Sequence, residues 1–274
     1  MRNKLNPSSP IIMGILNVTP DSFSDGGSYP SSELAVEKAL IMIKQGATII
    51  DIGGESTRPG SERVSAIEQK RRIIDVISQL KKVIDSNIII SVDTTSADVA
   101  SAAINLGVEM INDVSGGKDD SQMFSLVAKH DVYYCLMHMQ GVPKTMQDNP
   151  TYTDVTIEII DFLNLQANKA IATGVKKNKI IVDPGIGFGK TTAHNIEILK
   201  NLNKISNMGY LSLLGTSRKK LFSEVSENNN PLDRISGTCA TSTLGVMAGI
   251  NIFRVHDVWQ NKQAIDVAFA IKNI

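Results

Sequence analysis

The chain has 274 residues, with 28 basic and 28 acidic side chains, a formal net charge of zero and 42% hydrophobic residues. This balance supports a large buried core, and it excludes a disordered chain or a protein that binds nucleic acid through a strongly basic surface. Cys135 and Cys239 lie in separate apolar runs outside any CxxC pair, which predicts reduced core thiols and not a metal or redox site. There is neither a signal-peptide pattern nor an apolar run of the roughly 18 residues that a membrane helix needs, so we expect a cytoplasmic protein without a membrane partner.

Short apolar runs alternate with segments of helical spacing along the whole chain. The predicted strands are residues 11–17, 48–55, 88–94, 109–116, 133–140, 179–185, 210–217 and 252–257. They are rich in Ile, Val and Leu without polar alternation, which is typical of strands covered on both faces. The clearest predicted helices are residues 33–45, 66–83, 153–173 and 260–274.

Eight strand–helix units in 274 residues predict an α/β fold, a closed (β/α)8 TIM barrel. We expect one domain over residues 1–274, with residues 1–10 as an N-terminal extension; an open doubly wound sheet is the alternative fold. The longest predicted loops, residues 19–32, 56–65 and 141–152, each follow a strand. They should therefore lie on the face where such barrels carry their sites.

Nearly every predicted strand ends in a side chain that can form hydrogen bonds or carry charge. These residues are Asn17, Asp51, Glu55, Asp93, Asn112, His138, Asp183, Ser217, Arg218, Lys219, Arg254 and His256. In a barrel they would converge on one pocket at the carboxyl ends of the strands. A polar residue where a single strand leaves the core needs no function, but several of these lie inside the apolar runs.

Residues 179–191, KIIVDPGIGFGKT, form an apolar run that ends in an acid and a glycine-rich turn. A phosphate-binding P-loop would need Gly where Pro184 stands, and a dinucleotide-binding turn would need Gly where Lys190 stands. We therefore interpret Asp183 as an acid at a buried strand end. A buried carboxylate is costly without a partner, so Asp93 and Asp183 each need a cation or a ligand that presents N–H groups.

Three further stretches suit phosphate groups or the metal ion bound to them. The oxygens of the loop from Asn17 to Gly27 suit Mg²⁺ or the phosphates it carries, although this loop taken alone is better explained as a polar turn. Arg58 is a guanidinium fork on a constrained loop, which taken alone is also consistent with a solvated surface loop. The segment from Ser217 to Lys219 is predicted to begin a helix, where backbone N–H groups and two cations favour an anion.

Eight motifs resemble, in order, those of the dihydropteroate synthase family: NVTPDSFSDGG, DIGGESTRPG, SVDT, INDVSGG, LMHMQGVPKTMQ, VDPGIGFGKT, GTSRKKLF and FRVHDV. The first, second and last set this family apart from other pterin-binding barrels. The resemblance implies a transferase of folate biosynthesis that joins 6-hydroxymethyl-7,8-dihydropterin diphosphate to p-aminobenzoate and releases pyrophosphate. It also implies Mg²⁺ as cofactor, a homodimer and sensitivity of the family to sulfonamides.

The resemblance also implies roles for individual residues. The implied pterin-binding residues are Asp93, Asn112, Asp183, Lys219 and Arg254; those for the diphosphate are Asn17, Thr57, Arg58, Arg254 and His256; those for p-aminobenzoate are Phe23, Thr57, Arg58, Pro59, Phe188, Lys219 and Lys220. Asn17 is also the implied metal ligand, and the implied catalytic set is Asp93, Lys219, Arg254 and His256. Lys220 departs from the family pattern, because many members have Ser there.

No activated nucleophile is evident in the sequence, so we expect the aryl amine to attack directly while the bond to diphosphate breaks first. Two alternatives remain at this point. A pterin-dependent methyltransferase should lack the first loop and FRVHDV, and a non-catalytic pterin-binding paralogue should have lost residues such as Asn17, Arg58, Lys219 or His256.

Overall fold

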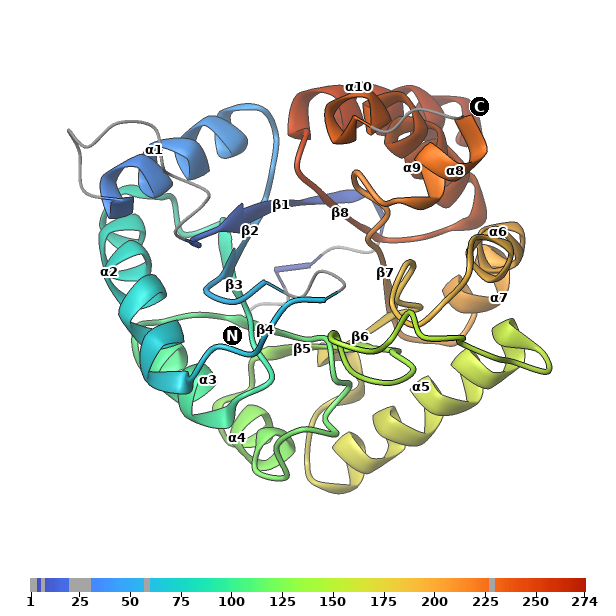
Figure 1. Ribbon diagram of the computed structural model, residues 1–274. Coiled ribbons are helices and arrows are strands. Elements are labelled where there is room, and N and C mark those ends of the chain that lie inside the picture. Colours follow the sequence, from blue (N-terminus) through green and yellow to red (C-terminus); the bar gives the residue numbers. More distant parts are fainter. Residues whose placement is uncertain (1–3, 6–7, 20–30, 57–59, 227–229) are drawn as a thin grey trace.

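The computed structural model describes residues 4–5, 8–19, 31–56, 60–226 and 230–274. Eight parallel strands form a closed barrel in chain order, because β1 (Ile11–Asn17) pairs with both β2 (Ile49–Gly53) and β8 (Ile252–Val255). The helices surround this barrel (Figure 1). The predicted (β/α)8 barrel is thus confirmed, and closure rules out the open sheet.

The remaining strands are β3 (Ile89–Asp93), β4 (Met110–Asp113), β5 (Tyr133–Met137), β6 (Ile180–Asp183) and β7 (Leu211–Leu214). The helices are α1 (Ser31–Lys44), α2 (Ala66–Val83), α3 (Ala97–Asn105), α4 (Met123–His130), α5 (Val155–Ala172), α6 (Thr192–Lys200), α7 (Leu202–Ser206), α8 (Leu221–Ser226), α9 (Ile235–Ala248) and α10 (Val258–Lys272), with short 3-10 turns η2 (Lys177–Lys179) and η3 (Pro231–Arg234). None of the helices within the described ranges has the length and apolar composition needed to cross a bilayer.

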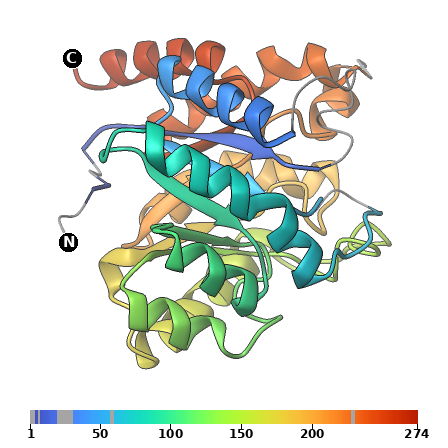
Figure 2. The same cartoon turned by 90° about the vertical axis from the view of Figure 1, so that its left-hand side faces the viewer.

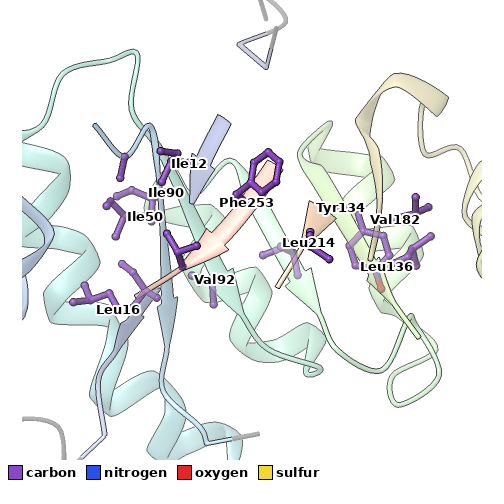
Figure 3. Close-up of a cluster of buried hydrophobic side chains, with 14 of the residues drawn as sticks. Ile12, Leu16, Ile50, Ile90, Val92, Tyr134, Leu136, Val182, Leu214 and Phe253 are labelled. Carbon is purple, nitrogen blue, oxygen red and sulfur yellow. The ribbon is translucent and has the colours of Figure 1, made fainter. Parts of the chain in front are cut away.

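Alternation along the strands builds two apolar layers. One face of each strand packs against the helices, as Ile50, Ile90 and Phe253 do (Figure 3). The opposite face fills the barrel interior with a second cluster that includes Ile49, Ile89, Met110, Ile181 and Ile252. Because successive side chains alternate, the residue two positions beyond an interior apolar residue also points inward.

The N-terminal segment closes the end of the barrel at which the strands begin. Leu5 is 2% exposed and belongs to the interior cluster, and the backbone N–H groups of Lys4 and Leu5 donate to the hydroxyl of Tyr133 at 3.1 and 3.3 Å. This end of the barrel lies opposite the loops that follow the strands (Figure 2). The described part of the predicted extension is therefore packed against the barrel.

The close approach of α9 to the barrel gives a test of this packing. A Cβ at Gly245 would lie 2.7 Å from Cε1 of the fully buried Phe253 ring and 3.0 Å from Leu214. Gly245→Ala should lower the free energy of unfolding by on the order of 1 kcal/mol, because overpacking outweighs the roughly 1 kcal/mol that Ala gains over Gly in a helix. Denaturant unfolding measures this, with exposed Ser236→Ala on the same helix as the control. A more stable Gly245→Ala protein would contradict the packing.

Candidate active site

Polar side chains form a ring directly above the apolar barrel interior. Asp183 stands two residues beyond Ile181, and Arg254 stands two residues beyond Ile252, so each points into the barrel. The same rule holds for the whole ring: Asp51, Asp93, Asn112, Asp183 and Arg254. The strand register therefore brings together the four ring residues that the sequence comparison had assigned to the pterin, and adds Asp51.

Arg254 is the centre of a buried ion cluster. Its Nε donates to Asp51 Oδ2 at 2.7 Å, and its Nη2 donates to Asp93 Oδ2 at 2.8 Å. Asp51 is fully buried and also accepts from Ser91 Oγ at 2.6 Å and from Asn112 Nδ2 at 3.1 Å. Sequence reasoning placed Asp51 among the strand-end residues expected at the pocket but assigned it no ligand, although its position inside an apolar run was the same signal that had singled out Asp93.

One guanidinium serves two carboxylates in this cluster. Burial raises the pKa of Asp93, and the nearby carboxylate of Asp51 acts in the same direction while Arg254 opposes it. With both carboxylates ionised, Asp51, Asp93 and Arg254 together carry one net negative charge. The cluster is therefore suited to a ligand that brings a positive charge or N–H donors.

Asp183 ends β6 and faces the same interior. Its Oδ1 accepts the backbone N–H of Gly185 at 2.7 Å, and no hydrogen bond within the described part of the chain uses its Oδ2. Gly215 lies beside Oδ2, where even a Cβ would stand 3.9 Å away. Burial raises the pKa of Asp183 to about 6, because only a backbone N–H and more distant cations favour its charge. Asp183 is thus an acceptor with one oxygen open to a ligand.

Phe188 and Lys219 meet beside Asp183. The ammonium of Lys219 lies 3.9 Å from the centre of the Phe188 ring, in a cation–π contact. Phe188 is 9% exposed and packs with Val114, Met139 and Met146. Val114 and Met139 also line a hollow whose other residues include Ser56, Arg63 and Pro143. An apolar wall with a cation above it suits a flat aromatic acid.

His256 follows β8 and is held by Ser217. The hydroxyl of Ser217 lies 3.0 Å from both the backbone N and the ring Nδ1 of His256. A ligand contact by this imidazole would therefore use Nε2. Sequence reasoning had treated Ser217 only as part of a helix start, and its contact with His256 is a tertiary feature that the sequence does not carry.

The prediction of a helix beginning at Ser217 with two cations for an anion is wrong. α8 begins only at Leu221, and Arg218 has a positive φ of 57°. Arg218 instead forms a two-point ion pair with Asp257, with Nε to Oδ2 at 2.9 Å. A guanidinium fork matches a carboxylate well, so the acid that follows His256 occupies Arg218.

The other predicted residues lie at the rim or outside the described ranges. Asn17 is half-buried at the end of β1, opposite Gly53. The side chain of Lys220 is 82% exposed and pairs with Glu224 at 3.0 Å. Phe23, Thr57, Arg58 and Pro59 lie outside the described residues, so their assignments stay predictions.

The described residues fit a metal ion whose other ligands would be water and the phosphate oxygens of a substrate. Within the described ranges, no cluster of three or more His, Cys, Asp or Glu side chains could hold a metal ion. Asn17 offers one carbonyl oxygen at the rim, a kind of ligand that Mg²⁺ accepts beside water and phosphate oxygens. Metal binding at Asn17 therefore stays a prediction that depends on a phosphate-bearing substrate.

Comparison with known proteins agrees with this geometry. Residues 13–256 match the family model described as pterin binding enzyme. A dihydropteroate synthase from Synechocystis is 43% identical over 260 residues, 95% of this chain and 89% of that protein. A dihydropteroate synthase structure from Clostridium difficile, solved with pteroic acid, has a TM-score of 0.90 and 47% identity, covering 96% of this chain and 97% of that one.

A second structure bears on the smaller substrate. The Xanthomonas albilineans dihydropteroate synthase with 4-aminobenzoic acid has a TM-score of 0.92 and 39% identity, covering 98% of this chain and 96% of that one. The match to the family model spans residues 13–256, a range that contains every position of the ring. The chain belongs to the dihydropteroate synthase family of pterin-binding enzymes.

Proposed function

We propose that this pocket condenses 6-hydroxymethyl-7,8-dihydropterin diphosphate with p-aminobenzoate to give 7,8-dihydropteroate and pyrophosphate. The observation that carries the proposal is the inward ring of Asp93, Asn112 and Asp183 next to the Phe188–Lys219 wall. Support comes from relatives that have been solved with pteroic acid, in which a pterin and p-aminobenzoate are joined, and with 4-aminobenzoic acid alone.

The pterin would lie over the apolar interior with its donor edge at Asp183. The 2-amino group and the adjacent ring N–H of a pterin are two parallel donors, and the ionised carboxylate is the matching acceptor. Asn112 and Asp93 would contact the remaining polar atoms of the pterin, since both side chains are buried and their residues are paired between β3 and β4. Charge-assisted hydrogen bonds of this kind contribute about 1.5–3 kcal/mol each.

The reaction would need little acid–base help. An aromatic amine is neutral near pH 7 and attacks directly, so the difficult step is the departure of diphosphate from the pterin methylene. Positive charge would develop on the pterin in that step, next to the Asp51–Arg254–Asp93 cluster, which carries one net negative charge when Asp93 is ionised. Such preorganised charge stabilises the transition state without further rearrangement.

The diphosphate would be received at the rim. His256, positioned by Ser217, and Asn17 are the described residues assigned to it, with Arg58 on the neighbouring loop. Bound Mg²⁺, held in part by Asn17, would offset the negative charge of the leaving group. Lys219 would contact both substrates, through the edge of the pterin ring and through the carboxylate of p-aminobenzoate.

We also propose a homodimer, from the family resemblance. α9 and α10 pack together and carry exposed apolar side chains: Leu244, Met247, Trp259, Val267 and Ile271. The cytoplasmic location stays a prediction from the sequence.

A reconstituted assay tests the function and the order of bond breaking. With both substrates and Mg²⁺, the purified protein should form 7,8-dihydropteroate and pyrophosphate in equal amounts. Without p-aminobenzoate, pyrophosphate should still be released, because the bond to diphosphate breaks before the amine attacks. Pterin binding without any product would favour the non-catalytic paralogue, and cleavage that depends strictly on the amine would contradict a dissociative order.

Asp183→Asn tests the acceptor. Affinity for the pterin should fall about 10- to 100-fold, because an amide N–H₂ would face the ligand's N–H groups. Calorimetric titration measures this, with surface Asp98→Asn as the control. Unchanged affinity would refute the assignment.

The same variant should unfold less easily at pH 7.5. Asp183 has a pKa of about 6 in the folded protein against an ordinary 3.8, so the unfolded chain loses this proton first as the pH rises. Asp183 should therefore make the wild-type free energy of unfolding decline between about pH 4 and pH 6, and the Asp183→Asn substitution should remove this contribution while that of Asp93, whose pKa is also raised by burial, remains. The gain above pH 6 should be about 1–3 kcal/mol, measured by denaturant unfolding.

A further inference from the structure

Lys190 is a buried lysine that the proposed chemistry does not use. The residue is 3% exposed, and its Nζ lies 2.9 Å from Nδ1 of His138, 2.9 Å from the carbonyl oxygen of Phe188 and 3.3 Å from the carbonyl oxygen of His138. These three acceptors match the three N–H donors of an ammonium. Burial lowers the pKa of the His138 ring to about 2, so that ring is neutral and its Nδ1 can accept.

Burial of this lysine is costly. An ammonium loses several kcal/mol of hydration in such a place, and burial lowers the pKa of Lys190 to about 7, although the carboxylate of Asp183 opposes that shift. In either protonation state the amine has N–H groups to donate to the backbone carbonyl oxygens. Two of its three acceptors belong to His138, just beyond β5, and the third belongs to the glycine turn that follows β6. Its bonds therefore join two neighbouring strand ends.

The glycine turn has one internal backbone hydrogen bond, from the N–H of Phe188 to the carbonyl oxygen of Gly185 at 3.1 Å. Gly185, Gly187 and Gly189 have φ values of 67°, 80° and 61°, a region that only glycine enters freely. The turn also lies directly on the end of β5, because a Cβ at Gly185 would stand 2.0 Å from the carbonyl oxygen of His138. Side chains of Asn195, Gln147 and Tyr152 form hydrogen bonds with the backbone of Gly187 and Gly189, whereas the carbonyl of Phe188 between them is held by Lys190.

Lys190 fastens the part of the turn that carries the aromatic wall. Its ammonium holds the carbonyl of Phe188, whose ring packs on Met139 and Met146 and lies under the ammonium of Lys219. Asp183, at the other end of the turn, is held separately by β6 and by the N–H of Gly185. Loss of the Lys190 bonds should therefore release Phe188 more than Asp183.

We propose that Lys190 is a positioning residue for the aryl-amine site, which fixes Phe188 through its backbone carbonyl. This inference rests on the proposed function, because it assigns the Phe188 wall to p-aminobenzoate. It predicts a selective effect on one substrate.

Lys190→Met tests it, since methionine keeps an unbranched chain and removes the three donors. The KM for p-aminobenzoate should rise about tenfold or more, while the dissociation constant of the pterin changes less than about threefold. Lys179→Met is the matched control: Lys179 is 7% exposed, lies just before the start of β6 at the opposite end of the barrel and stacks on Tyr133 at 3.9 Å. The Lys179→Met control should lower the free energy of unfolding without changing the KM for p-aminobenzoate or the dissociation constant of the pterin. Equal weakening of both substrates by Lys190→Met would overturn the proposal.

A double-mutant cycle with Phe188→Ala identifies the route. If Lys190 acts through Phe188, the double variant should have the KM of Phe188→Ala within about twofold, whereas multiplied effects would overturn the proposal. If Lys190→Met does not fold, Lys190→Gln keeps an N–H donor without charge and should raise the same KM about threefold; an unchanged KM would overturn it. A wild-type protein that forms no dihydropteroate would instead refute the proposed function.

Discussion

The site depends on one guanidinium that joins two carboxylates inside a closed barrel. Arg254 comes from the last strand, and Asp51 and Asp93 come from the second and third, so the ion cluster spans the interior across β1. Removing one partner of such a buried group costs about 3–5 kcal/mol, because the remaining charge is left uncompensated. The same three residues therefore hold β8 to β2 and β3 and determine the charge of the pocket.

The buried carboxylates of the pocket outnumber the cations that are paired with them among the described residues. Two acids share Arg254, and Asp183 has only a backbone N–H and nearby cations, so burial raises the pKa of both Asp93 and Asp183. Without a ligand, the burial of these two carboxylates lowers the stability of the folded protein, because their charged forms lose hydration. The free energy stored in their desolvation is released when N–H donors or positive charge arrive, which links the instability of the empty pocket to its affinity.

The barrel could be predicted from the sequence because its signals are local. α2 (Ala66–Val83) has the predicted bounds, since its apolar stripe is regular and Ser65 caps its first turn. The strand-end acids were equally visible, because a carboxylate inside an apolar run is rare. The partner choices were not visible: Arg254 reaches an acid 203 positions away, Arg218 turns to Asp257, and Lys190 pairs with His138 across two strands. Such pairings depend on strand order and register, which a sequence pattern does not specify.

The packing of Leu5 against the barrel interior determines from which end ligands can reach the pocket. Among the described residues, Leu5 and the interior apolar layer fill the end at which the strands begin. The polar ring therefore faces the loop end. Ligands that reach it would enter and leave from that same end.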